Sequence, residues 1–530
     1  MFKSVLLILG MGICACVHGA EDELFGAEWR VSGHDFANSR SQPAEVRISP
    51  ANVHSLAVRW VFTTGADVSA TPTVSGDVVY FPDWAGNLFA VNRNTGRLIW
   101  SHKISDYDGS SGALTRTSPA IHGSDIIVGD IEVRNELHNG TSVMAIDRNT
   151  GALHWITRVD SHPTAWITGS PVVFRDVVYV GVASQEEAFA IAPFFGVPYS
   201  CCTFRGSVVA LDARSGKLLW KTYTVPDNGG KPGGYSGGGV WQPPAIDLVR
   251  DQLYVGTGNN YSVPDTVLEC EKQAIANGHP RANCAAPDDH FDTALALDLA
   301  NGHIRWSRRL LKYDVFTDAC VVPQAAAGCP SPAGPDYDLG GSGPNLLPGL
   351  VGFGQKSGVY WALYPGNGDI RWRTQVGPGG GTGGIQLGTA TDGRRTYAAI
   401  SNSNFAPYTL VPSGEQITWG AWSALDAATG EPIWQTADPT SGAIDPGSVS
   451  VANGLVYAGS LSGFMYALDA ATGKILWSFD SGGSVVDGPA IVDGVLYWGS
   501  GYGPDKPTPG IANNKLYAFS LKPPRGKPAR

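Results

Sequence analysis

The sequence has few charged residues and no excess of basic ones. Asp, Glu, Lys and Arg make up 16% of the 530 residues, and 37 Lys and Arg stand against 47 Asp and Glu, which gives a net charge of −10. A nucleic-acid-binding protein needs basic side chains to neutralise phosphates, so this balance argues against nucleic acid as a partner. An acidic surface instead keeps a protein soluble.

Long hydrophobic runs are also missing. Residues 1–20, MFKSVLLILGMGICACVHGA, combine one Lys, a short apolar stretch and small residues, which is typical of a secretory signal. The stretch is too short and too interrupted by Gly to predict a transmembrane helix. Ile13-Cys14-Ala15-Cys16 also resembles a bacterial lipobox, in which Cys16 would carry a lipid anchor. We expect an exported chain, with signal peptidase I and lipoprotein processing both left open.

Cysteine is scarce, and the sequence Cys-x-x-Cys-His is absent, which argues against a covalently attached haem module. Beyond the expected signal the cysteines are Cys201, Cys202, Cys270, Cys284, Cys320 and Cys329. An even number in an exported chain predicts disulfides. Cys270–Cys284 and Cys320–Cys329 would each close one long loop, which leaves Cys201 and Cys202 for each other. Two separate thiols, or pairings of Cys201 and Cys202 with the loop cysteines, stay open.

One pattern recurs seven times: an Ala, an acid or near-equivalent two places on, a Gly, and a Trp ten residues after the Ala. We call it the Ala–Trp repeat, and its copies span Ala90–Trp100, Ala145–Trp155, Ala210–Trp220, Ala296–Trp306, Ala362–Trp372, Ala424–Trp434 and Ala467–Trp477. An eighth copy begins around Ala518 and does not reach its Trp. Apolar runs on both sides of a Gly turn indicate strand, tight turn, strand.

The spacing of the repeat predicts the architecture. Successive Ala residues lie between 43 (424 to 467) and 86 (210 to 296) residues apart, which suits four-stranded propeller blades with inserted loops. We therefore predict an all-β, eight-bladed β-propeller over residues 21–524, with a polar tail at 525–530.

The Ala–Trp repeat, with its Trp docking into the next blade, resembles that of the quinoprotein alcohol dehydrogenases. The resemblance implies pyrroloquinoline quinone (PQQ) and a divalent or trivalent cation on the propeller axis. Noncatalytic scaffold proteins of the bacterial envelope share the repeat, so the residues of the cofactor site must decide between the two.

Two segments resemble the family's cofactor floor and metal site. In WITGSPVVFRDVVYVGVASQEE, Thr168 and Glu186 have the family interval, which makes Glu186 a metal ligand with Glu187 as its competitor. In GGGVWQPPAIDLVRDQLYVGTGNN, Trp241 would lie under the quinone, and Asn259 would bind the metal in preference to its neighbour Asn260.

Further segments imply the catalytic base and the quinone contacts. In GPDYDLGGSGPNLLP, Asp336 would be the general base and a metal ligand. Asp338 would be a second acid that in some relatives adds a lanthanide ligand, so Ca²⁺ and a lanthanide both stay open. GFGQKSGVYWAL would place Lys356 against the quinone oxygens. Arg116 in ALTRTSPAI would pair with a cofactor carboxylate, because Arg binds carboxylates bidentately. YAAISNSN offers Asn402 as a cofactor contact, one residue out of register.

The sequence also departs from the methanol-type enzymes of this family. Where they carry two adjacent cysteines over the quinone, near Arg116, this chain has Gly, Ser and Ala, and Ser69 stands where they have a Glu. The adjacent pair occurs instead in FFGVPYSCCTFRG. We predict that a Cys201–Cys202 disulfide lies over the quinone ring there.

The segments SQEE, CCTFRGSVVALDA and GQKSGVYWAL are most similar to the polyvinyl-alcohol dehydrogenase branch. This similarity implies PQQ-dependent oxidation of secondary or polymeric alcohols in the periplasm, with an external electron acceptor such as cytochrome c. A quinoprotein dehydrogenase for small primary alcohols is one alternative. The other is a noncatalytic scaffold, which would keep the Ala–Trp repeat without the set Thr168, Glu186, Asn259, Asp336 and Lys356.

Overall fold

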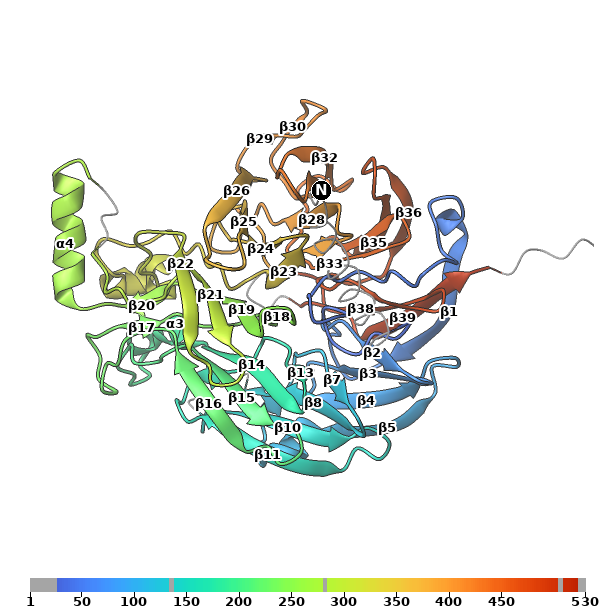
Figure 1. Ribbon diagram of the computed structural model, residues 1–530, viewed down its shortest axis with the longest axis horizontal. Helices are drawn as coiled ribbons and strands as arrows, with labels where there is room; N and C mark the ends of the chain where they lie inside the picture. The colour runs from blue at the N-terminus through green and yellow to red at the C-terminus, as the bar shows by residue number, and fades with distance from the viewer. Residues whose placement is uncertain (1–25, 133–137, 280–283, 504–508, 523–530) are drawn as a thin grey trace, which may run out of the picture.

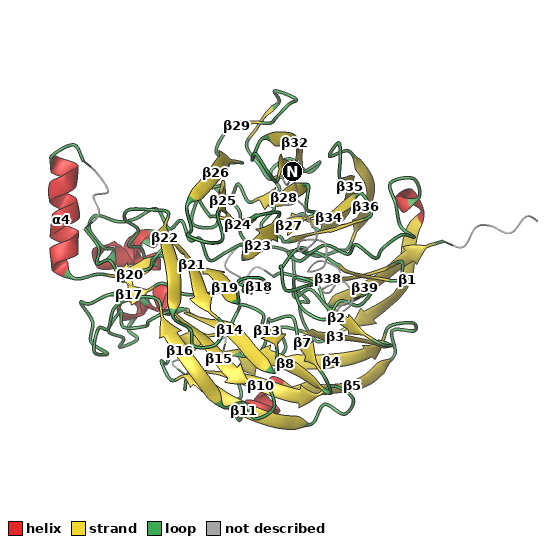
Figure 2. Cartoon of the chain, in the orientation of Figure 1, coloured by secondary structure: helices red, strands yellow, loops and turns green. Residues whose placement is uncertain are grey.

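Eight antiparallel sheets form the blades of a propeller (Figure 1), and strands dominate the chain (Figure 2). Each blade has four strands, and in the third blade the short strand β12 (Ala165–Trp166) also pairs with β14 (Val177–Ser184). The computed structural model describes residues 26–132, 138–279, 284–503 and 509–522. The expected signal (1–20) and polar tail (525–530) lie outside these residues. The predicted all-β, eight-bladed architecture is confirmed.

In blades 1 to 7 the chain runs from the innermost to the outermost strand, and in blade 8 the outermost strand is β1 from the N-terminal side. Blades 1 to 4 consist of β2–β5 (Thr73–Ser75, Val78–Pro82, Asn87–Asn92, Leu98–Lys103); β7, β8, β10 and β11 (Ala120–His122, Asp125–Gly129, Thr141–Asp147, Leu153–Asp160); β13–β16 (Val172–Phe174, Val177–Ser184, Ser207–Asp212, Leu218–Tyr223); and β18, β19, β21 and β22 (Ala245–Asp247, Gln252–Gly256, Thr293–Asp298, Ile304–Arg309). Blades 5 to 8 consist of β23–β26 (Pro344–Leu347, Leu350–Gly354, Val359–Leu363, Ile370–Gln375); β27, β28, β31 and β32 (Ala390–Thr391, Arg395–Ile400, Ala421–Asp426, Pro432–Ala437); β33–β36 (Val449–Ala452, Leu455–Gly459, Phe464–Asp469, Ile475–Asp480); and β37, β38, β39 and β1 (Ala490–Val492, Val495–Ser500, Lys515–Leu521, Leu56–Thr63).

The Ala–Trp repeat joins the two outer strands of a blade and fastens the blade to the next one. In each copy the Ala lies opposite the Trp, as in the pair Ala90 and Trp100. The Trp100 indole then donates to the carbonyl of Arg148 in blade 2 at 3.0 Å. Gly151 of blade 2 lies over that indole with φ +76°, and a Cβ there would come within 3.0 Å of the ring. The Gly of the repeat is therefore needed for both its backbone conformation and the close contact.

The two ends of the propeller chain complete the eighth copy of the repeat. β1 pairs with β39, so that Trp60 lies opposite Ala518, and the Trp60 indole donates to the carbonyl of Arg93 in blade 1 at 2.9 Å. Figure 1 shows this junction, with β1 in blue beside β39 in red. The missing Trp of the eighth copy is thus supplied from the N-terminal side, which closes the ring.

Replacement of Trp60 should therefore weaken the whole ring. We expect Trp60→Ala to lower the free energy of unfolding by roughly 3–5 kcal/mol, the usual cost of truncating a buried aromatic side chain. Trp60→Phe, which keeps one aromatic ring but removes the N–H donor and part of the indole, should cost less, roughly 1–3 kcal/mol. Denaturant unfolding followed by circular dichroism measures both. Equal midpoints for Trp60→Ala and the wild type would show that the closure adds no stability.

Residues 29–47 run across the innermost strands of the blades. An innermost strand exposes unpaired backbone groups, and this segment satisfies many of them. Its backbone or side-chain contacts reach all eight blades: Trp29 with Val74, Arg30 with Ile121, Phe36 with Phe174 and Ile246, Ala37 with Leu346, Ser39 with Thr391, Arg40 with Val451, and Glu45 with Gly494. The segment thereby ties the blades together at the axis.

The long loops carry the remaining elements. These are β12 (Ala165–Trp166), the pairs β6 (Ala113–Leu114) with β9 (Ile131–Glu132), β17 (Ser236–Gly237) with β20 (Asn260–Ser262) and β29 (Tyr408–Thr409) with β30 (Gln416–Ile417), the helices α2 (Ile104–Asp108), α3 (Glu186–Phe189) and α4 (Asp265–Ala276), and the 3-10 turns η1 (Val53–Ser55), η2 (Ala192–Phe195), η3 (Asp318–Cys320) and η4 (Pro323–Gly328).

All three predicted disulfides are confirmed. Cys270 on α4 is bonded to Cys284, Cys320 is bonded to Cys329, and Cys201 is bonded to its neighbour Cys202. Within the residues that the structure describes, we find no helix with the length and apolar character needed to cross a membrane.

Candidate active site

A pocket lies at one end of the propeller, where the loops of several blades meet. Because adjacent strands are antiparallel, the start of an innermost strand and the end of the second strand lie at the same end of a sheet. Thr168, Trp241 and Gln386 precede the innermost strands β13, β18 and β27, whereas Glu187 and Asn259 follow the second strands β14 and β19. All five line one cavity of about 190 Å³.

The structure brings most of the predicted site residues together. Those that line the pocket are Arg116, Thr168, Trp241, Asn259, Asp338 and Lys356. Asp336 lies directly behind the lining, because a Cβ on the lining residue Gly381 would be 2.6 Å from Asp336 Oδ2. The predicted residues outside the lining are Glu186, Cys201, Cys202 and Asn402.

Trp241 is a half-buried indole held from two sides. Thr168 Oγ1 donates to the Trp241 carbonyl at 2.9 Å, which fixes the backbone. A Cβ on Gly341 would lie 2.8 Å from Cη2 of the indole, so the ring packs directly against the glycine backbone. Lys356 Nζ is 5.7 Å from the ring centroid. Trp241 thus offers a rigid, flat surface to the pocket.

Lys356 is a buried cation between two acids. Its Nζ lies 2.8 Å from Asp336 Oδ1 and 2.8 Å from Asp338 Oδ2. Burial alone would lower the pKa of Lys356, but Asp336 and Asp338 raise it well above its usual value. Lys356 therefore stays charged. Asp338 Oδ1 also accepts the backbone N–H of Asn259 at 2.6 Å, which links the acid to the neighbouring blade.

The loop that carries Asp336 is fixed by another buried acid. Asp314 accepts the backbone N–H groups of Asp336 at 3.0 Å and of Tyr337 at 2.7 Å. These contacts hold Asp336 in a left-handed conformation, φ +56°, which few non-glycine residues adopt. Burial raises the pKa of Asp336 well above its usual range, against the opposing effect of Lys356.

The adjacent acids Glu186 and Glu187 face different surroundings. Glu187 lines the pocket, and burial, with Asp336 nearby, raises its pKa well above the usual value. Glu186 is fully buried outside the lining and accepts the backbone N–H groups of Thr203 and Phe204, both at 2.8 Å, and the Tyr199 hydroxyl. The structure thus places the competitor Glu187, rather than Glu186, in the pocket.

The Cys201–Cys202 disulfide lies beside Glu186. One potential ligand atom from each of Glu186, Cys201 and Cys202 falls within 4.8 Å of the others, a group found among the described residues. Disulfide sulfurs are not thiolates, however, and thiolates are the form that binds metal. Cys202 packs into the core with Phe204. The pair therefore belongs to the loop that Glu186 holds through the N–H groups of Thr203 and Phe204, and it does not line the pocket.

Asn402 makes a local turn. Its Nδ2 donates to the Ala406 carbonyl at 2.7 Å, and its Oδ1 accepts the Ala406 N–H at 3.0 Å. Both polar atoms of the Asn402 amide are thus bonded within its own loop and do not face the pocket. The one-residue offset seen in the sequence agrees with this placement.

Several lining residues were not predicted from the sequence. They include Trp166, Ser184, Tyr261, Thr382 and Gln386. Tyr261 had a usable signal, because side chains two residues apart on an extended segment share a face and Tyr261 follows Asn259 by two. Thr382 and Gln386 lie in a Gly-rich loop with no such periodicity.

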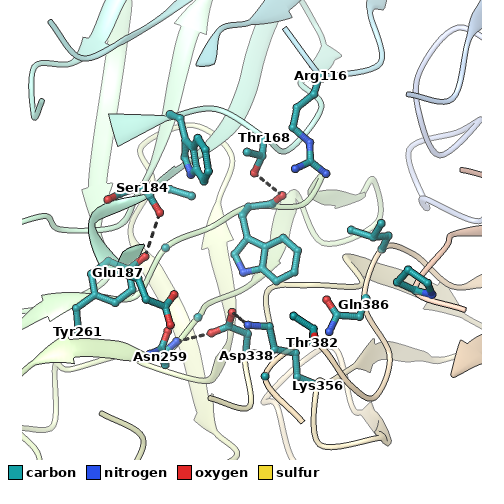
Figure 3. Close-up of a pocket in the computed structure, with 18 of the residues that line it drawn as sticks. Arg116, Thr168, Ser184, Glu187, Asn259, Tyr261, Asp338, Lys356, Thr382 and Gln386 are labelled. Atoms are coloured by element: carbon teal, nitrogen blue, oxygen red, sulfur yellow. Dashed lines mark hydrogen bonds and ion pairs between the residues drawn. The ribbon is translucent and has the colours of Figure 1, made fainter. Parts of the chain in front are cut away.

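Negative charge concentrates on one side of the pocket. Figure 3 shows Glu187, Asn259, Asp338 and Lys356 gathered there. Asp336 and Asp318 also lie within electrostatic reach of Lys356. Four carboxyl groups around one ammonium group disfavour full ionisation unless a cation balances them.

The Asn259 amide adds an oriented oxygen to this acidic side. Its Nδ2 donates to the carbonyls of Asn260 and Phe316, both at 3.1 Å. With its amide hydrogens used in this way, Oδ1 is the atom that remains for another partner. Carboxylate and amide oxygens are the ligands that hard cations prefer.

The chain is similar to known alcohol dehydrogenases in sequence and in fold. The chain is 32% identical to the polyvinylalcohol dehydrogenase of Sphingopyxis sp. (strain 113P3), over 93% of this chain and 76% of that protein. The crystal structure of quinohemoprotein alcohol dehydrogenase from Comamonas testosteroni superposes with a TM-score of 0.67 and 19% identity, covering 96% of this chain and 82% of that one. A europium-containing methanol dehydrogenase superposes with a TM-score of 0.65 and 18% identity, covering 95% and 100%.

A family model described as outer membrane protein assembly factor BamB matches residues 51–196 and 420–522, which are repeat-bearing parts of the propeller. The chain belongs to the family of PQQ-type alcohol dehydrogenases. Within that family it is similar to the polyvinylalcohol dehydrogenases over most of its length.

Proposed function

We propose that this protein is a PQQ-dependent dehydrogenase of secondary or polymeric alcohols that acts in the periplasm. Its electrons pass to an external acceptor such as cytochrome c. The observation that carries the proposal is the meeting of a flat, fixed Trp241 with the acidic pocket side formed by Glu187, Asn259 and Asp338 around Lys356.

The lining suits both a quinone and a cation. PQQ is planar and carries three carboxylates, which fits the Trp241 ring and the cations Arg116 and Lys356. The cation would be held by Glu187, by Asn259 through its amide oxygen, and by Asp338. Ca²⁺ and a lanthanide both satisfy this donor set. When bound, the quinone would supply the two-electron acceptor, and the cation would act as a Lewis acid.

The protein's own part is to orient the alcohol and to take up its proton. Asp336 is the proposed general base, since its carboxylate lies behind Gly381 at the edge of the pocket and burial makes it more basic. Lys356 holds Asp336 Oδ1 at 2.8 Å and so fixes the direction of the carboxylate. Asp314 fixes the backbone beneath it.

The main alternative outside the enzymes is a noncatalytic scaffold protein. The BamB-described model accounts for the repeats at both ends of the chain but not for residues 197–419. That central region contains Trp241, Asn259, Asp336 and Lys356. A buried lysine between two buried acids is costly to keep and is typical of functional sites, which favours the enzyme.

Reconstitution tests the proposal. Purified protein should bind PQQ in the presence of Ca²⁺ or a lanthanide, with a changed quinone absorbance spectrum, and should then oxidise alcohols with a redox dye as acceptor. A series from ethanol to 2-alcohols and poly(vinyl alcohol) separates a small-primary-alcohol enzyme from the proposed one. Failure to bind PQQ with either metal would favour the scaffold.

Glu187 and Glu186 form a matched pair for testing the metal site. We expect Glu187→Gln to raise the metal concentration for half-maximal quinone binding by roughly 10–100-fold, because a charged ligand is lost. Glu186→Gln should leave that concentration within a few-fold. It should instead lower the free energy of unfolding by about 1–3 kcal/mol, because it weakens acceptors for Thr203, Phe204 and Tyr199. The reverse pattern would make Glu186 the ligand.

A further inference from the structure

Two inserted loops that begin or end at acids in or near the pocket carry no charge at all. The first, residues 188–204, follows Glu187 directly, and the second, residues 319–335, runs between Asp318 and Asp336. Neither contains Asp, Glu, Lys, Arg or His. Since Glu187 lines the pocket and Asp318 and Asp336 adjoin it, both loops begin or end at the pocket wall.

The two loops pack against each other. η3 of the second loop contacts α3 at the start of the first. Phe194 lies against Gly328, where a Cβ would come within 2.9 Å of its ring. The Cys320–Cys329 disulfide closes the second loop, and Phe189 and Tyr199 pack edge to face at 5.7 Å within the first. Together they form one continuous surface, which we call the neutral rim.

The neutral rim exposes large apolar side chains. Phe195 is 58% exposed and Val321 is 66% exposed, and Phe194 and Val197 are each 40% exposed. The first loop also bears an open depression lined by Pro193, Gly196, Val197, Pro198, Tyr199 and Ser200. Contiguous exposed apolar groups of this kind mark binding surfaces, whereas single exposed apolar side chains are common on any protein.

The chemistry of the rim selects an uncharged occupant. An extended polymer of secondary alcohols has an apolar carbon backbone and regularly spaced hydroxyls. The methylene groups would contact Phe195 and Val197. The hydroxyls would find Ser200 as donor or acceptor and Tyr199 as an acceptor, since the Tyr199 hydroxyl already donates to Glu186. A charged protein acceptor relies instead on electrostatic steering, which a surface without charges does not provide.

We propose that the neutral rim is the docking surface for an uncharged polyhydroxylated polymer chain, which it guides to the pocket. The oxidation of the docked polymer rests on the proposed function, whereas the binding of the polymer to the rim does not. The closed second loop and the packed aromatic pair keep the surface preformed, so little ordering is needed on binding.

The test compares Phe195→Ser with a control on the opposite end of the same propeller. Val249 is 61% exposed and lies in the turn between β18 and β19, away from the pocket end of the sheet. We expect Phe195→Ser to weaken binding of poly(vinyl alcohol) to the cofactor-free chain by roughly tenfold, measured by calorimetry, and to raise the polymer KM similarly in the reconstituted enzyme. Turnover of pentane-2,4-diol should not change. Val249→Ser should leave all three unchanged.

Three outcomes decide the matter separately. Unchanged polymer binding in both Phe195→Ser and Val197→Ser, with intact thermal unfolding, would overturn the proposal. Slower reduction of cytochrome c by Phe195→Ser at an unchanged polymer KM would assign the rim to the electron acceptor and also overturn it. If the wild type binds polymer but oxidises no alcohol, the proposed function fails while the calorimetric comparison still tests the rim.

Discussion

Asp336→Asn should abolish most alcohol oxidation while leaving the cofactor in place. Asparagine keeps the shape of the side chain but cannot accept the hydroxyl proton, so the rate should fall by roughly 10²–10⁴-fold, the usual scale for a lost general base. Lys356 keeps its 2.8 Å contact with Asp338, so the pocket should retain its form. Stopped-flow reduction with a small secondary alcohol, alongside a PQQ absorbance titration, measures both quantities.

A neighbouring acid provides the control for this variant. Asp318 also lies within electrostatic reach of Lys356, but we assign it no role with the substrate. Asp318→Asn should therefore change the rate by no more than a few-fold. Equal losses in Asp318→Asn and Asp336→Asn would mean that the pocket needs negative charge near Lys356 and not a base at Asp336. Near-normal turnover in Asp336→Asn would remove the assignment of the base.

The repeat made the fold predictable from sequence. A Trp at a fixed distance from an Ala occurs seven times in the sequence, and each copy forms a hairpin and a contact to the next blade. The Trp of the eighth copy could not be predicted in this way, because Trp60 lies more than four hundred residues away from Ala518 along the chain. A pattern search along the sequence cannot join residues that pair only when the ring closes.

The site was predictable where the residues sit in short, rigid segments. Trp241, Asn259 and Lys356 each lie in the loop next to a propeller strand, so the blade fixes the end of the sheet at which they lie. Glu186 and Glu187 could not be separated in this way. They lie at the start of the four-residue helix α3, where period-two alternation ends, and only the hydrogen bonds from Thr203 and Phe204 decide which acid turns away from the pocket.

The path of the loop that carries Cys201 and Cys202 also depends on tertiary contacts. The sequence established that two adjacent cysteines follow Glu186 in one insertion, and the bond between them is confirmed. Their prediction over the quinone depended on how a loop of seventeen residues folds back, from 188 to 204. That path is set by the buried Glu186 carboxylate, a tertiary contact that carries no local sequence signature.

Trp241→Ala should cause the largest loss of cofactor affinity. An aromatic pair contributes roughly 0.5–1.5 kcal/mol beyond the value of its buried area, and the area itself adds more, so removing the platform should weaken PQQ binding by roughly 10–100-fold. Fluorescence or absorbance titration with PQQ at saturating Ca²⁺ measures this directly, without reference to turnover.

Two further variants test whether the loss of PQQ affinity depends on an aromatic ring at position 241. Trp241→Phe keeps an aromatic face against Gly341 and should retain PQQ affinity within a few-fold. Trp166→Ala removes the other tryptophan of the lining and should weaken PQQ binding less than Trp241→Ala does. A larger loss in Trp166→Ala than in Trp241→Ala would make Trp166 the floor of the site. Unchanged affinity in Trp241→Ala would rule out the platform, and with it the reason for packing the indole so closely on the backbone of Gly341.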